Sequence, residues 1–136
     1  MVSVCRIVTI YIALFLVALN CVAETVSPKI RLELYLASSD VSEFRNILYE
    51  FAKSEGLSIE DIGAVLPPRE GRMPFYIKLD FERKVEIRVT DFLTQNKFFI
   101  AFYDRDSGES FQEIAMRLER MLQARWPDKL VPYNGM

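Results

Sequence analysis

Residues 72–104 read RMPFYIKLDFERKVEIRVTDFLTQNKFFIAFYD, and this stretch decides the fold. Apolar and polar residues alternate along it with a period of two, which is typical of strands with one buried face. The alternation predicts three strands, at Pro74–Glu82, Lys84–Asp91 and Lys97–Tyr103. The connections between them are too short for anything but hairpins, so the stretch predicts an antiparallel meander. In the third strand both faces are apolar, and alternation alone does not say which face is buried.

One further strand and two helices flank the meander. Ile30–Ala37 alternates in the same way and predicts a strand. Apolar residues at helical spacing then predict a helix from Asp40 to a stop at Gly56, and a second helix that ends near Arg125. The element order is therefore β-α-β-β-β-α. The helical stripes predict the following core residues: Val41, Phe44, Ile47, Leu48, Phe51, Ala52, Phe111, Ile114, Ala115, Leu118, Met121 and Leu122.

These elements predict an α+β fold, a two-layer sandwich with both helices on one face of a mostly antiparallel, four-stranded sheet. Asp40 and Glu43 predict an acidic capping box at the start of the first helix. We expect Leu57–Gly71 to be an irregular connection. Lys129–Tyr133 either forms a short edge strand or packs on the core, since Pro132 argues against a central position.

The first 23 residues have the pattern of a secretory signal peptide. Arg6 precedes an apolar run from Ile7 to Leu19, and small residues at Cys21 and Ala23 predict cleavage after Ala23. The alternatives are an uncleaved anchor and a lipidated Cys21. Residues 24–29 are then a polar lead-in, residues 30–136 form a single domain, and the protein is expected in the periplasm or outside the cell. Contact with a membrane is expected only through an uncleaved or lipidated N-terminus.

The composition excludes disulfides in the domain and argues against nucleic acid as a partner. Both cysteines lie within residues 1–23, so the domain must fold without disulfides, and the chain has no histidine. Residues 24–136 carry 16 basic and 19 acidic side chains. This mildly acidic balance argues against nucleic acid as a partner, because nucleic-acid binding needs clustered lysine and arginine.

The sheet face opposite the helices is the most informative surface. On the predicted register it carries aromatic residues among charges, and tyrosine and arginine are enriched where proteins bind one another. One interpretation is a protein-binding or self-association surface, and the other is an ordinary exposed sheet with Phe99 partly covered by the C-terminal tail. For the binding interpretation the candidate residues are Tyr35, Tyr76, Lys78, Arg88, Phe99 and Tyr103.

Enzymatic function is the weaker expectation. Asp80 and Glu86 on neighbouring strands could serve acid–base chemistry, but sheets carry such pairs routinely as solvated charge. We therefore expect an accessory or inhibitory binding domain of the cell envelope, with no catalytic residues, no cofactor and no metal ligands. The alternative is a ligand-binding or sensor module that uses residues 57–72 as a lid, with Arg69 and Arg72 meeting an anionic group.

Overall fold

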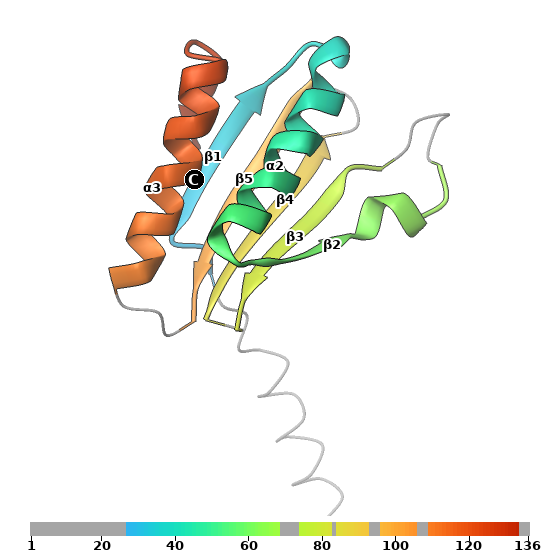
Figure 1. The fold of residues 1–136 in the computed structure, drawn as a ribbon. Helices are drawn as coiled ribbons and strands as arrows, with labels where there is room; N and C mark the ends of the chain where they lie inside the picture. Colours follow the sequence, from blue (N-terminus) through green and yellow to red (C-terminus); the bar gives the residue numbers. More distant parts are fainter. Residues whose placement is uncertain (1–26, 69–73, 83, 93–95, 106–108, 134–136) are drawn as a thin grey trace, which may run out of the picture.

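The protein folds as an α+β sandwich with one antiparallel sheet. The computed structural model describes residues 27–68, 74–82, 84–92, 96–105 and 109–133, and Figure 1 shows the chain as a ribbon. In chain order the elements are β1 Ile30–Tyr35, η1 Ser38–Asp40, α2 Val41–Glu55, β2 Ser58–Asp61, η2 Ile62–Val65, β3 Tyr76–Phe81, β4 Val85–Phe92, β5 Lys97–Asp104, α3 Glu109–Arg125 and β6 Leu130–Pro132.

The sheet has six strands in the order β2-β3-β4-β5-β1-β6, and every neighbouring pair is antiparallel. The predicted meander is confirmed as β3, β4 and β5. The prediction of four strands is wrong, because β2 and β6 add one strand at each edge. β1 lies between β5 and β6, so the first strand of the chain is an inner strand of the sheet.

The two added strands form because their backbones pair with β3 at one edge of the sheet and with β1 at the other. β2 lies within the segment expected to be irregular, and it pairs with β3 so that Ile59 lies opposite Leu79. The Ser58 hydroxyl donates to the carbonyl oxygen of Asp80 at 3.1 Å. At the other edge, Leu130 of β6 is buried and lies opposite Leu34. The edge strand considered for Lys129–Tyr133 is thus present, and Pro132 lies in the outermost strand, as expected for proline.

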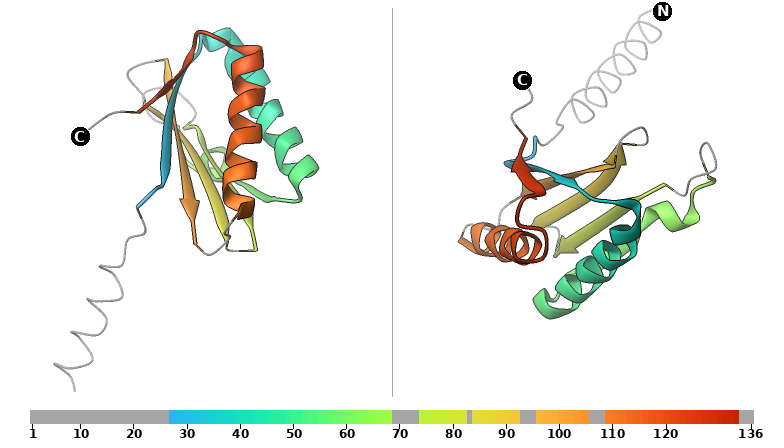
Figure 2. Two further views of the ribbon diagram at one scale, coloured as in Figure 1. Left: turned by 90° about the vertical axis from the view of Figure 1, so that its left-hand side faces the viewer. Right: turned by 90° about the horizontal axis from the view of Figure 1, so that it is seen from above.

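Both helices cover the same face of the sheet, which Figure 2 shows edge-on and from above. The strand residues that face them are buried or partly buried, and in β5 this face carries the buried Phe98, Ile100 and Phe102. At one end of the core, Phe44 of α2 stacks on Phe75 with ring centroids 5.5 Å apart and meets Phe98 edge-on at 5.2 Å. This packing settles the orientation of β5, on which alternation was silent.

The helix ends agree only in part with expectation. Gly56 ends α2 in the left-handed conformation, with φ 69°, and its backbone N–H donates to Ala52. The predicted capping box is wrong: the Asp40 side chain makes no capping hydrogen bond, and Glu43 instead accepts two hydrogen bonds from Arg125 of α3. Met121 was predicted in the core and is 38% exposed on α3.

Gly63 allows η2 to approach the start of β3. A Cβ atom at this position would lie 2.2 Å from the carbonyl oxygen of Pro74 and 2.8 Å from the backbone nitrogen of Tyr76. No side chain fits in that space. The glycine therefore lets the chain turn back closely from β2 toward β3.

Candidate functional site

The sheet face turned away from α2 and α3, which we call the helix-free face, is the candidate site. Its residues follow from the strand register and alternate with the buried core residues. It carries Arg31, Glu33, Tyr35, Ser58, Glu60, Tyr76, Lys78, Asp80, Glu86, Arg88, Thr90, Lys97, Phe99, Ala101 and Tyr103.

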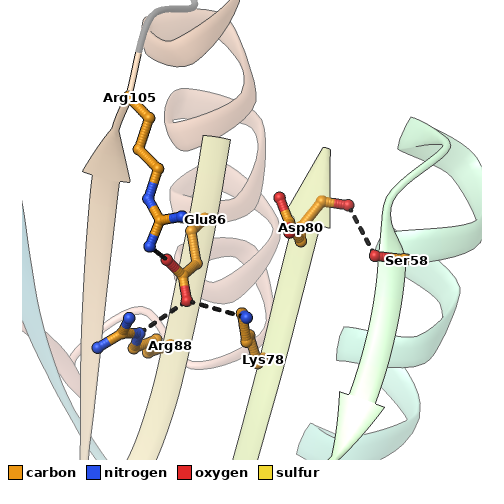
Figure 3. Close-up of polar contacts among 6 residues, drawn as sticks. All are labelled: Ser58, Lys78, Asp80, Glu86, Arg88 and Arg105. Atoms are coloured by element: carbon orange, nitrogen blue, oxygen red, sulfur yellow. Dashed lines mark hydrogen bonds and ion pairs between the residues drawn. The ribbon is translucent and has the colours of Figure 1, made fainter. Parts of the chain in front are cut away.

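A buried carboxylate organises one half of this face. Glu86 of β4 is only 1% exposed, although no helix covers it. Arg88 Nε donates to Glu86 Oε1 at 2.8 Å, Arg105 Nη2 donates to Oε2 at 2.7 Å, and Lys78 Nζ lies 3.5 Å from Oε1. These four residues, which we call the Glu86 cluster, are drawn in Figure 3. Arg105 is held in place because its backbone N–H donates to the carbonyl oxygen of Lys84.

The surrounding cations keep Glu86 ionised. Burial alone would raise the pKa of its carboxyl group, but the hydrogen bond from Arg88 and the charges of Arg88, Arg105 and Lys78 outweigh burial and hold the pKa below its usual 4.5. The same hydrogen bond raises the pKa of Arg88. Glu86 is thus a fixed negative charge and a poor proton donor near neutral pH.

A smaller group, which we call the Glu33 cluster, occupies the other half of the face. Glu33 of β1 is 8% exposed, Lys97 Nζ lies 2.9 Å from its Oε1, and the Tyr35 hydroxyl donates to its Oε2 at 2.9 Å. Lys97 also lies 5.8 Å from the centre of the Tyr35 ring. The hydrogen bond to Glu33 raises the pKa of Lys97.

The residues predicted for binding all lie on this face, in or beside the Glu86 cluster, in the Glu33 cluster and next to Thr90. Arg88 stacks over the Tyr103 ring at 4.7 Å and lies opposite Lys78, while Tyr35 belongs to the Glu33 cluster. Tyr76 lies opposite Thr90, which in turn lies opposite Phe99. The Phe99 ring meets Tyr133 edge-on at 5.2 Å, so the residue after β6 takes up part of its surface.

Sequence reasoning missed the burial of two acidic residues. Alternation placed Glu33 and Glu86 on the helix-free face, where acidic side chains are normally solvated, and Asp80 does lie directly opposite Glu86. The interpretation of Glu86 as solvated charge is wrong. Its same-face neighbour Arg88 is visible in the sequence, but Arg105 reaches it from beyond the end of β5, which no periodicity reveals.

A pocket of about 390 Å³ lies beside Leu66 and Pro67, within residues 57–72, which the alternative interpretation treats as a lid. Its lining consists of Leu66, Pro67, Pro74, Phe75, Tyr76, Thr90 and Asp91. Among the residues of this lining that the structure describes, Asp91 is the charged one. Arg69 and Arg72, the residues considered for binding an anion, lie outside the described residues.

Two further findings concern the described residues, and a third concerns the comparison with known proteins. Within the described ranges, no three His, Cys, Asp or Glu side chains gather as they would around a metal ion. No helix in this part of the chain is long and apolar enough to cross a bilayer. No protein family, curated protein or solved structure matches the sequence or the fold.

Proposed function

We propose that this protein is a non-enzymatic binding domain that engages another protein through the helix-free face. The observation that supports the proposal is the arrangement around Glu86, where a buried carboxylate holds Lys78, Arg88 and Arg105 at the surface of a sheet that no helix covers. Charged side chains on an open sheet face can stay in water, so the stability of the sheet alone does not require a buried carboxylate at this position.

The exposed parts of this face suit protein recognition. Tyr35 is 41% exposed, and the side chain of Arg88 is 38% exposed while its guanidinium stays fixed between Glu86 and the Tyr103 ring. Side chains that are already ordered lose less conformational entropy when a partner binds. Tyrosine and arginine are also the residues that most often carry binding energy in interfaces. The face therefore offers ordered anchors rather than freely moving charges.

A photo-cross-linking experiment tests this proposal. We expect a photoreactive amino acid in place of Tyr76 or Tyr103 to capture a discrete protein in living cells. The matched control is Tyr49, which is 42% exposed on α2 in the helix layer. Capture from Tyr49 at the same level, or no capture from either position on the helix-free face, contradicts the proposal.

We also propose that the protein is exported with residues 1–23 as its signal peptide. These residues lie outside the described part of the chain, so the proposal rests on their sequence. Mass spectrometry of the protein from its host should find a chain that begins at Glu24. A mature chain that keeps Met1, or one that begins with a lipid-modified Cys21, would replace this proposal with one of the two anchored alternatives.

A further inference from the structure

On the helix-free face the acidic side chains of Glu33 and Glu86 are buried, and the cations that pair with Glu86 are accessible. In the described part of the chain the two buried charged residues, Glu33 and Glu86, both belong to this face, and both are acidic. The side chains that partner Glu86 remain accessible, with 29% of Lys78 and 38% of Arg88 and of Arg105 exposed. An approaching molecule therefore meets the cations before it meets the carboxylates beneath them.

The Glu86 cluster carries more positive than negative charge. Three cations share one carboxylate, which leaves an excess of two positive charges within the cluster. The nearest acidic residues on the described part of the face lie toward β2, with Asp80 opposite Glu86 and Glu60 opposite Lys78. Both lie on the β2 side of the cluster, whereas Arg88 and Arg105 reach Glu86 from β4 and from the residue after β5.

The two arginines have donors that Glu86 does not use. Arg88 contacts Glu86 through Nε and Arg105 through one Nη atom, and a guanidinium group has five N–H donors. Pairs between arginine and carboxylate are strongest when two parallel N–H groups meet the two carboxylate oxygens. Because Glu86 already fixes both side chains, a carboxylate from outside would find the donors in place.

We infer that the partner of this face presents a segment rich in aspartate and glutamate, whose carboxylates accept hydrogen bonds from Arg88 and Arg105 beside the Tyr103 ring. This inference rests on the proposed function and specifies the chemistry of the partner. Charge complementarity selects the acidic segment, since the accessible layer at this point is cationic and the acidic layer is buried.

Fluorescence anisotropy with designed peptides tests the inference on the full chain in a non-ionic detergent. The probe is a labelled peptide of glutamates around a central tryptophan, compared with peptides in which glutamine or lysine replaces every glutamate. We expect the glutamate peptide to bind at least about tenfold more tightly than either of the others. Its affinity should fall as the salt concentration rises from about 20 to about 200 mM.

Two variants locate the binding on the surface. Arg105→Gln should weaken binding of the glutamate peptide about fivefold or more, whereas Arg120→Gln, which removes one exposed cation from α3 in the helix layer, should leave it unchanged. The double variant Glu86→Gln/Arg88→Gln keeps the net charge of the protein, because it removes the buried carboxylate together with the arginine that pairs with it. It should also weaken binding, provided that its melting curve shows a folded protein.

Three results would overturn the inference. They are equal binding of the glutamate and glutamine peptides, equal effects of Arg105→Gln and Arg120→Gln, and binding to anionic lipid vesicles that depends on Arg105 while the glutamate peptide does not bind. The proposed function is judged separately by cross-linking. If Tyr76 or Tyr103 captures a protein and Arg105→Gln does not reduce the capture, the binding face stands and the acidic partner does not.

Discussion

Glu86 shows how a single buried charge can organise a surface. Removing a carboxylate of this size from water is unfavourable unless hydrogen bonds and opposite charges replace the water. Here two arginines and a lysine do so from β3, β4 and the residue after β5. The negative charge thereby ties together three neighbouring strands on the side that has no helix to hold them.

Glu86→Gln should reveal this contribution as a dependence on pH. Because the pKa of Glu86 is lowered in the folded protein, its contribution to stability is present above the usual value of 4.5 and is lost as the pH falls through the folded pKa. We expect the variant to lower the free energy of unfolding by about 1–3 kcal/mol at neutral pH. The difference from wild type should shrink in acid, where the wild-type side chain is also uncharged.

Urea denaturation at a series of pH values measures this difference. Glu60→Gln is the matched control, because Glu60 is an exposed acid on the same face. A difference between wild type and Glu86→Gln that stays constant across the acid range would show that the ionised form of Glu86 is not what stabilises the protein.

At the scale of elements, β6 is the smallest strand and completes the sheet. It covers the outer edge of β1. Just before β6, the carbonyl oxygen of Lys129 accepts a hydrogen bond from the backbone N–H of Tyr35, and just after it, the backbone N–H of Tyr133 donates to the carbonyl oxygen of Arg31. It also buries Leu130, and Tyr133 reaches Phe99 on the helix-free face. This strand therefore contributes to the core and to the candidate site together.

Ending the chain after Lys129 should remove Leu130, Tyr133 and the pairing of β6 with β1. We expect the free energy of unfolding to fall by about 2–4 kcal/mol, from the lost burial of Leu130 and the lost backbone hydrogen bonds. The uncovered edge of β1 should also increase self-association. Chemical denaturation and size-exclusion chromatography measure both effects. A chain that ends after Tyr133 is the control, and equal stability of the two truncated chains would contradict the role given to β6.

Elements with strong periodicity could be predicted from the sequence, and short ones could not. β3 and β4 alternate over six or more residues, and the helices bury continuous stripes, so the type and the buried face of these elements could be predicted. β5 could be predicted as a strand, but its two apolar faces left its orientation open. β2 has four residues with one apolar side chain that faces the core, Ile59, which is too little pattern to separate it from a loop. Arg125, the partner of Glu43, and Arg105, one of the partners of Glu86, come from distant parts of the chain, and periodicity carries no information on such pairs.

For the molecule as a whole, the same limit applies to strand order. Alternation shows that a strand has an inner and an outer face, but it does not say which strands are neighbours. β1 pairs with β5, so Ile30 lies opposite Phe102. Alternation left the face of β5 open and missed Ser58 and Glu60 of β2, but it predicted the residues that β1, β3 and β4 contribute to the helix-free face. The division of this face into two ion-pair clusters depends on strand order and could not be predicted.

The inner position of β1 affects how the chain can fold during synthesis. Its first partner, β5, is made about 70 residues later, and at ribosomal rates of about 5–20 residues per second the delay is roughly 4–14 s. For that time the N-terminal third of the domain has α2 but no neighbouring strand to pair with β1. Contacts between such distant residues also slow folding in general. β1 should therefore stay unpaired until β5 has left the ribosome.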